Sequence, residues 1–502
     1  MINKNTLRTR IFLFLAIVIT LNFLFNRFFV RLDLTGDKQY TLSQATKNIL
    51  TELDEPVTVT AYFSENLPPQ IEKIKQDFED VLAEYDQRSR GNVVYEFLNP
   101  NESETTEQQA QQEGIAPQIV NVRESDQFTQ QRVYLGAKLQ YGEQKEVIPA
   151  ISSRATMEYE LSKAIKKISA KSRPKIGFIK GHNEANLASM AQVQTALEVL
   201  YQPSEVALSD SALNSYKTLV LVNPKDSFSQ ADFSRLDAYM QNGGGLLVAF
   251  NRVDMDFTTA SGNEVTTGLE VWLDNKGIII DNQFVIDENC GQISVQDQSR
   301  SFFGMPMTQR IAFPYFPIIK SFNQDHIISR GIEEIIMPGA SHITYNGKDK
   351  FTVLASTSSR SGYAEVPFQI DIKRQWTNAD FPTRKLTVGG ALEPANGGKM
   401  VVYSDGDFAI NGTGQQQQRL GENNINLFVN GVDWLSDDTG LAALRTKAVV
   451  SRPLEKDLDE SQRSMVKWGN FLFPIFLIIL YGFFRSQARK RKRNKWANEQ
   501  YV

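Results

Sequence analysis

Two apolar segments lie near the ends of the chain, and shorter runs with strand or helix periodicity fill the region between them. Residues 11–30 and residues 468–484 are dominated by aliphatic and aromatic side chains. A helix needs about 20 apolar residues to cross the bilayer core, so both segments are predicted to be transmembrane helices. The second is short, and Trp468 and Arg485 are expected to hold its ends at the membrane interfaces.

Each apolar segment has a second interpretation. The first would be a signal peptide if it were cleaved, but its outer end is built of large residues without an A-x-A-like site, which favours an uncleaved anchor. The second would be a buried core helix in a soluble protein, but Pro474 is tolerated better in a membrane helix. We therefore expect two anchors.

Basic residues stand on the terminal side of both segments. Arg8 and Arg10 precede the first, and the second is followed by Arg485, Arg489, Lys490, Arg491, Lys492 and Arg493. Positive charge next to a membrane span tends to stay on the cytoplasmic side. The sequence thus predicts a cytoplasmic N-terminus (residues 1–10), a basic cytoplasmic tail (485–502) and a body on the far side of the membrane.

The first part of the body, residues 31–155, has the pattern of a small α/β domain. Residues 57–63 (VTVTAYF) and 93–98 (VVYEFL) are predicted strands, and apolar residues at helical spacing lie between them. A third strand is predicted to begin within 115–120, and a hairpin to span 133–149. This β-α-β-α-β-β order resembles the thioredoxin fold. No cysteine follows the first strand, so thiol–disulfide exchange is excluded.

Residues 156–440 alternate between strands and helices, which predicts a parallel sheet with both faces covered. The predicted strands are residues 175–180, 218–222, 246–250 and 399–403. Ser229 and Asp232 have the spacing of a helix cap. Residues 255–390 are rich in strands and form either an insertion or an extension of the sheet, and residues 441–467 are expected to be a linker. The predicted fold class is a membrane-anchored α/β protein, in which a thioredoxin-like domain precedes a flavodoxin- or amidotransferase-like parallel-sheet domain.

Composition and charge are those of a globular protein that does not bind nucleic acid. With 41% hydrophobic and 22% charged residues, the 502-residue chain has room for two or three domains. The two tails carry a net charge of +9, and the chain total of −4 leaves −13 on the remainder. An acidic body disfavours nucleic acid, and the basic tail is expected to meet membrane lipid. Cys290 is the single cysteine, so no internal disulfide forms.

Parallel sheets bind ligands at the C-terminal ends of their strands, so the residues that follow the predicted strands are possible ligand-binding residues. His182 and Glu184 follow the first strand and form a base with its orienter, part of a metal site, or a polar loop cluster. Asn251 follows the third strand. Asp405 and Asp407 follow the last strand and suggest a calcium loop, but the next ligand position is not an oxygen donor, which favours a loop that caps a helix.

The sequence lacks the motifs of the common enzyme classes. An amidotransferase-like domain would carry a nucleophilic cysteine after the third strand, where Asn251 stands instead. Cys290 lies in an acidic stretch that is expected to raise the pKa of its thiol. No Walker A, G-x-S-x-G or HExxH motif occurs. We predict no catalytic residue, cofactor or metal. If the protein works in an energy-driven process, a partner must supply the energy.

Several short motifs occur in an order that resembles one protein family. They are RLDLT at 31–35, YTLS at 40–43, the segments 223–245 and 423–435, YSDGDF at 403–408, and the last anchor with Phe473 and Pro474. Together they resemble the GldG family, the gliding-motility ABC-transporter auxiliary proteins of Bacteroidetes. The middle domain also resembles the non-catalytic, amidotransferase-like GIFT domain. The motifs at 31–43 have a plainer interpretation as a helix cap close to the membrane.

The resemblance implies a bacterial inner-membrane protein with a periplasmic body, partnered by an ABC ATPase subunit and a multi-span permease subunit. The family is often described as substrate-binding. Our first hypothesis is a non-catalytic, twice-anchored exoplasmic component of an ABC transporter complex associated with gliding motility. The alternative is an envelope hydrolase-like enzyme that uses His182, Glu184, Asp405 and Asp407. A structural scaffold without a ligand is a third hypothesis.

Overall fold

The computed structural model describes most of the body and the last helix. The described residues are 13–14, 40–124, 127–170, 172–302, 305–382, 385–414, 417–436, 440, 444 and 460–498. Arg8, Arg10, the predicted first transmembrane helix apart from residues 13–14, and most of the predicted linker lie outside these residues. The chain divides into two compact units, Met1–Val449 and Val450–Val502.

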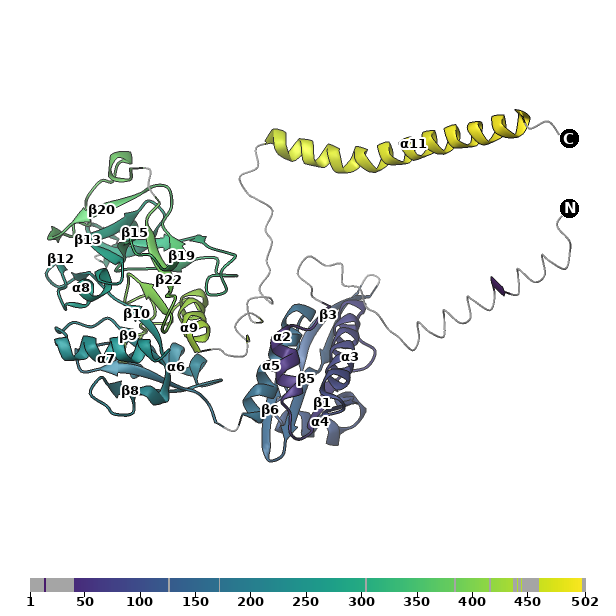
Figure 1. The fold of residues 1–502 in the computed structure, drawn as a ribbon, viewed down its shortest axis with the longest axis horizontal. Helices are drawn as coiled ribbons and strands as arrows, with labels where there is room; N and C mark the ends of the chain where they lie inside the picture. Colours follow the sequence, from purple (N-terminus) through teal and green to yellow (C-terminus); the bar gives the residue numbers. More distant parts are fainter. Residues whose placement is uncertain are drawn as a thin grey trace. The chain divides into compact units, whose positions relative to one another are not determined.

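A four-stranded sheet forms the first domain (Figure 1). Its order is β2-β1-β5-β6, in which β1 is parallel to β2 and antiparallel to β5, and β5 is antiparallel to β6. The strands predicted at 57–63 and 93–98 are present. The elements are β1 (Val57–Phe63), β2 (Val93–Leu98), β5 (Leu135–Tyr141), β6 (Gln144–Ile148), α2 (Gln44–Thr51), α3 (Pro69–Ser89), α4 (Glu104–Gln112) and α5 (Arg154–Ser169).

A buried glutamate connects three helices of this domain. Ser43 caps α2 by accepting a hydrogen bond from Thr46 N, and its own N–H donates to Glu158 Oε1 at 2.6 Å. Thr46 Oγ1 donates to the same oxygen at 2.8 Å, and Tyr85 OH, from α3, donates to the Glu158 carbonyl at 2.9 Å. The YTLS segment therefore has a structural role, in agreement with its interpretation as a helix cap.

The third predicted strand of this domain does not join the sheet. Instead, β3 (Gln118–Glu124) pairs only with β4 (Gln127–Val133), as a separate hairpin. Neither strand has a continuous apolar face in the sequence, and Ile119 is 68% exposed. The strand predicted to begin within 115–120 is therefore present, but without a continuous apolar face it gains little from entering a core sheet.

An eight-stranded sheet forms the core of the second domain, in the order β16-β19-β22-β23-β10-β9-β7-β8. The neighbouring strands from β23 to β8 are parallel, as predicted. They are β7 (Lys175–Lys180), β8 (Gln202–Ala207), β9 (Tyr216–Val222), β10 (Gly245–Ala249) and β23 (Met400–Tyr403). Parallel neighbours bring the ends of these strands to one edge of the sheet, where the candidate residues follow.

The parallel strands bury apolar side chains on both faces, so the sheet is the middle layer of three. On β9, Val220 and Val222 belong to a core with α6 (Ala191–Leu197) and α9 (Glu422–Ser436). Leu219 and Leu221 face the other way, into a core with α7 (Gln230–Gln241) and α8 (Leu269–Asp274). This explains why the inner strands β9, β10 and β23 contain unbroken apolar runs, whereas the edge strand β8 (QPSEVA) does not.

Some of the strand-rich residues 255–390 extend the eight-stranded sheet, and the others form separate small sheets. Strands β16 (Ser321–Phe322), β19 (Lys350–Ser356) and β22 (Thr387–Glu393) continue the sheet in antiparallel fashion beside β23. The others form three small sheets. They are β11 (Val253–Asp256), β12 (Ser261–Glu264), β13 (Ile278–Asp287), β14 (Cys290–Phe302), β15 (Met305–Ile319), β17 (Ile335–Ile336), β18 (Ser341–Tyr345), β20 (Ser361–Glu365) and β21 (Phe368–Gln369).

The second unit contains one long helix, α11 (Glu460–Asn498), which includes Pro474. Within Ser461–Arg491 it is long and apolar enough to cross a membrane, and none of that window is buried. Its exposed apolar side chains include Trp468, Phe471, Leu472, Phe473, Phe476, Ile478, Ile479 and Phe483. Exposing this much apolar surface to water is unfavourable, which supports the predicted membrane helix at 468–484.

Phe428 on α9 provides a test of the packing against the parallel sheet. Its side chain is fully buried, so Phe428→Ala should lower the free energy of unfolding by about 3–5 kcal/mol. Phe257→Ala removes the same atoms from a side chain that is 59% exposed, and should cost at most about 1.5 kcal/mol. Chemical denaturation of both variants checks this. Equal losses of unfolding free energy in the two variants would mean that α9 does not pack against the sheet as described.

Candidate functional site

The candidate residues of the second domain meet at the C-terminal edge of the parallel strands. His182 and Glu184 follow β7, Asn251 follows β10, and Asp405 and Asp407 follow β23. Because β23, β10, β9 and β7 are parallel neighbours, these loops lie side by side. The residues nevertheless separate into two hydrogen-bonded networks.

Asp405 is fully buried and accepts three backbone hydrogen bonds. Its Oδ1 accepts from the N–H groups of Asp407 at 2.7 Å and Phe408 at 3.1 Å, which closes a tight turn after β23. Its Oδ2 accepts from Gly339 N at 3.0 Å, in the segment before β18. Asp405 therefore fixes its own loop and fastens a distant segment to it, rather than capping a neighbouring helix as predicted.

Asp407 is held between two amide side chains. Asn223 Nδ2 donates to its Oδ1 and Asn251 Nδ2 donates to its Oδ2, both at 2.6 Å. Asn251 Oδ1 in turn accepts from Gly406 N at 2.5 Å. The loops after β9, β10 and β23 are thereby joined through one carboxylate. A Cβ on Gly406 would lie 2.7 Å from the Cβ of Asn223, so this close approach requires glycine.

Asn223 is a member of this network that the sequence patterns did not single out. It directly follows the apolar strand β9, has a positive φ of 50°, and is followed by Pro224. The Asn-Pro pair directly after an apolar run is the sequence signal of a strand end with a turn, and it could have pointed to Asn223. Its Oδ1 is buried and has no hydrogen-bond partner among the described residues.

Burial and mutual repulsion disfavour two negative charges in this network. Burial, with a further contribution from the charge of Asp407, raises the pKa of Asp405 to about 7, against the opposing effect of its backbone hydrogen bonds. Burial also raises the pKa of Asp407, while the hydrogen bond from Asn251 and the charge of Lys225 act in the other direction. Burial therefore favours the protonated form of Asp405 near neutral pH, beside the Asp407 carboxyl that the two amides hold.

This pair predicts how stability depends on pH. The folded protein keeps the proton on Asp405 to a higher pH than the unfolded chain does, so stability falls as the pH rises from about 4 through about 7. Between about pH 5 and pH 8 the free energy of unfolding should drop by about 2–3 kcal/mol. Urea unfolding of the wild type and of Asp405→Asn measures this, and the variant should lose most of the slope. An unchanged slope would contradict the assignment.

His182 forms the second network, at the end of β7. Its Nδ1 lies 3.1 Å from Glu184 Oε1, its Nε2 lies 3.5 Å from Asp232 Oδ2, and its ring stacks on Phe228 with centroids 3.8 Å apart. Asp232 belongs to the capping box that begins α7, together with Ser229, as predicted. Burial acts to raise the pKa of Asp232, but hydrogen bonds from Ser229 and the nearby imidazole outweigh it and lower that pKa.

Both imidazole nitrogens of His182 face carboxylates, so the residue connects the β7 loop with the start of α7. The predicted pairing with Glu184 is present. Within the described part of the chain, His182 makes no hydrogen bond or ion pair with Asp405 or Asp407, whose partners are given above. A shared proton path between the two networks, which the enzyme hypothesis needs, is therefore not formed by direct contacts. No group of three or more His, Cys, Asp or Glu side chains in the described residues is arranged to hold a metal ion.

The chain after β10 differs from a nucleophile elbow in its backbone as well as in its residues. Such an elbow connects a strand to a helix, whereas here Asn251 and Arg252 lead into β11. Arg252 donates to the carbonyl of Val265 and to Glu264 Oε1, which fixes the start of this hairpin. Cys290 lies elsewhere, on β14, where burial followed by the charges of Asp287 and Glu288 raises the pKa of its thiol. These positions hold no activated nucleophile.

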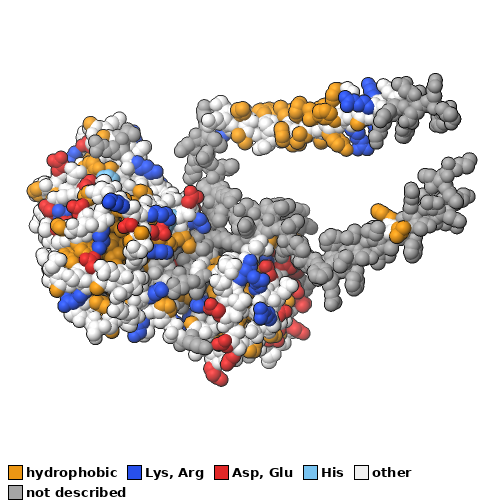
Figure 2. Space-filling view, in the orientation of Figure 1, with side chains coloured by type: hydrophobic (Ala, Val, Ile, Leu, Met, Phe, Trp, Pro, Cys, Tyr) orange, Lys and Arg blue, Asp and Glu red, His pale blue; other side chains and the backbone are white. Residues whose placement is uncertain are grey.

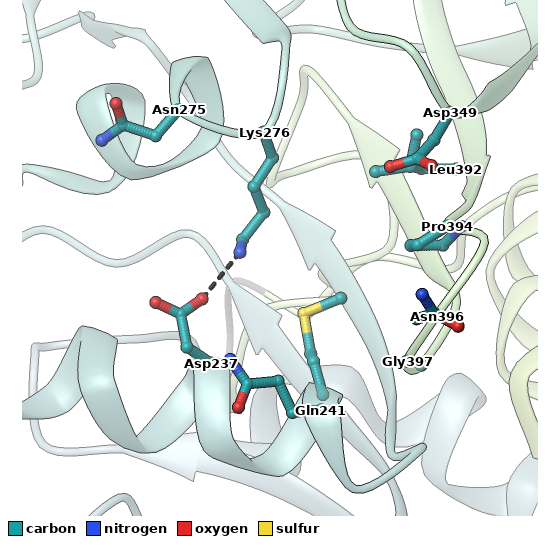
Figure 3. A pocket seen from close by; sticks show the side chains of 11 residues that line it. Asp237, Gln241, Asn275, Lys276, Asp349, Leu392, Pro394, Asn396 and Gly397 are labelled. Carbon is teal, nitrogen blue, oxygen red and sulfur yellow. Dashed lines mark hydrogen bonds and ion pairs between the residues drawn. The ribbon is translucent and has the colours of Figure 1, made fainter.

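A pocket of about 260 Å³ lies at the opposite edge of the sheet and does not include the candidate residues (Figure 3). It is lined by Asp237, Met240, Gln241, Asn275, Lys276, Asp349, Leu392, Pro394, Asn396, Gly397 and Gly398. Lys276 Nζ donates to Asp237 Oδ1 at 2.6 Å and lies 4.3 Å from the centre of the Trp272 ring. Lys276 and Asp237 thus satisfy one another, and Asp349 Oδ1 accepts a hydrogen bond from Ala395 N. In α/β sheets ligands bind at the C-terminal ends of the strands, so the two strand-end networks are better candidates for a functional site than this pocket.

Comparison with solved structures gives weak similarities. The N-terminal domain of mmIFT52 is 16% identical with a TM-score of 0.36, over 52% of this chain and 97% of that one. A putative ThuA-like protein from Parabacteroides merdae is 13% identical with a TM-score of 0.28, over 57% and 95%. PurLQS from Thermotoga maritima is 13% identical with a TM-score of 0.26, over 52% and 99%. Scores this low carry no argument.

Sequence comparison gives a firmer result. An uncharacterized protein of Borreliella burgdorferi is 20% identical over 349 residues, which is 67% of this chain and 66% of that protein. A domain family of unknown function matches residues 36–140. The family model for ABC transporter auxiliary proteins, described as an ABC-type uncharacterized transport system, matches residues 173–437, slightly more than half of the chain. The chain therefore belongs to this ABC transporter auxiliary family.

Proposed function

We propose that this protein is a non-catalytic, twice-anchored exoplasmic component of an ABC transporter complex. The observation that carries the proposal is the combination of an unburied apolar helix, α11, with an α/β domain of a transport-system family. The strand-end edge of that domain is filled by internal hydrogen bonds instead of a nucleophile and a base. Such a chain acts by binding partner subunits or a ligand.

The partners of this proposal are an ABC ATPase subunit and a multi-span permease subunit. The sequence has no Walker A motif, so ATP hydrolysis must occur on another chain. Residues 11–30 and α11 would pack beside the permease within a bacterial inner membrane. With basic residues outside both spans, the two termini would be cytoplasmic and the body periplasmic.

The first domain would be a thioredoxin-like binding module without redox activity. The order β2-β1-β5-β6, in which β1 is parallel to the edge strand β2 and the β1–β5 and β5–β6 pairs are antiparallel, supports this assignment. The motifs at 31–43, 223–245 and 403–408 support membership of the GldG family and hence a role in gliding motility. The second domain would be a GIFT-like, amidotransferase-like domain, since a hairpin replaces the elbow after β10.

Purification of the tagged, full-length protein from its native membrane in mild detergent tests the proposal. Mass spectrometry should find an ABC ATPase and a multi-span permease in stoichiometric amounts. As a control, a variant in which an unrelated apolar helix of equal length replaces residues 468–484 should stay in the membrane but recover less permease. Recovery of the wild type alone, or with cell-wall enzymes, would contradict the transporter assignment and would favour substitution of His182 and Asp405 as the next test.

A further inference from the structure

The membrane helix does not end where its apolar run ends. Helix α11 continues from Phe484 through the basic segment to Asn498 without a break (Figure 1). Figure 2 shows lysine and arginine side chains gathered at this end of the helix, beyond the apolar stretch. The basic segment is thus a rigid continuation of the span rather than an irregular tail, and its charges have fixed positions along one axis.

The spacing of these charges matches a layer of lipid headgroups. At 1.5 Å per residue, Arg485 and Arg493 lie about 12 Å apart along the helix. A headgroup layer is about 5–8 Å thick and the Debye length is about 8 Å in physiological salt. The first turn of the segment therefore lies within the layer and the rest within reach of its field. Arg485 Nη1 donates to Tyr481 OH at 3.0 Å, next to the end of the apolar run.

The charges surround the helix instead of forming one face. Arg485, Arg489 and Arg493 follow one another at intervals of four residues and share a side, while Lys490 and Arg491 lie on other sides, and all five are exposed. No acidic residue occurs between 485 and 498. The other flank of the span carries Arg463 and Lys467 with Glu460. Headgroups surround a helix on every side, whereas a protein partner would contact one face.

We propose that the basic extension of α11, residues 485–498, binds anionic phospholipid headgroups of the leaflet from which it emerges. The proposal rests on the membrane-spanning placement of α11 in the proposed function, but not on the transporter partners. Charge complementarity with negative headgroups supplies the attraction, and the helical continuation holds the basic side chains at the depth where those headgroups lie.

The test uses the full-length protein in nanodiscs that contain spin-labelled phosphatidylglycerol or spin-labelled phosphatidylcholine. Electron paramagnetic resonance gives the fraction of each lipid that is immobilised at the protein. The immobilised fraction of phosphatidylglycerol should exceed that of phosphatidylcholine by at least about fivefold, the ratio expected when one basic side chain interacts with the charged membrane surface. The preference should decrease in high salt and in Arg489→Gln/Arg493→Gln. The matched control, Arg463→Gln/Lys467→Gln, removes the same charge from the other flank and should keep the preference.

Carbonate extraction of native membranes distinguishes a failure of the proposed membrane span from a failure of the lipid-binding proposal. If carbonate releases the protein, the proposed membrane span itself is wrong. If the protein resists carbonate but shows equal immobilisation of both lipids, the span holds and the lipid proposal is overturned. Equal losses in the two double variants would also overturn it, because a general charge effect would then explain the preference. Loss of a co-purified acidic protein in Arg489→Gln/Arg493→Gln, without any lipid preference in the wild type, would assign the segment to a protein partner instead.

Discussion

The carboxylate of Asp407, held between the amides of Asn223 and Asn251, is the constraint on which the second domain depends. Three parallel strands end in these loops, and parallel strands have no tight turns of their own to fix their ends. Asp405 also accepts a hydrogen bond from Gly339 N, so that the strand-rich segment is fastened to the same edge. The cost is the burial of two carboxyl groups side by side, which the raised pKa of Asp405 reflects.

This arrangement has a consequence for function. In parallel sheets the C-terminal edge is where ligands and reacting groups are placed, but here its polar side chains bond to one another and to the backbone. His182 is likewise engaged on both nitrogens, by Glu184 and Asp232. The candidate residues at this edge are thus engaged with one another, and the chain belongs to an ABC transporter auxiliary family.

Much of the fold could be predicted from the sequence, but the hydrogen-bonded network only in part. Unbroken apolar runs such as TLVLV identified the parallel strands, because both faces of that sheet are buried. Position after a strand identified Asp405 and Asp407. Asn223 follows a predicted strand as Asn251 does, but the sequence does not show which strand-end amides reach Asp407, and Gly339 was missed because its contact with Asp405 crosses 66 residues. The strand predicted to begin within 115–120 is present as β3, but its pairing with β4 could not be predicted, since strand periodicity does not say which sheet a strand joins.

Hydrogen–deuterium exchange at the turn after β23 tests the central claim, that this edge is closed by internal hydrogen bonds. The N–H groups of Gly406, Asp407 and Phe408 donate to side chains of the network, in a loop that would otherwise exchange quickly. In the full-length protein, peptides that cover residues 404–410 should exchange as slowly as those that cover β23. Exchange as fast as in an exposed loop would contradict the account, because the edge would then be open.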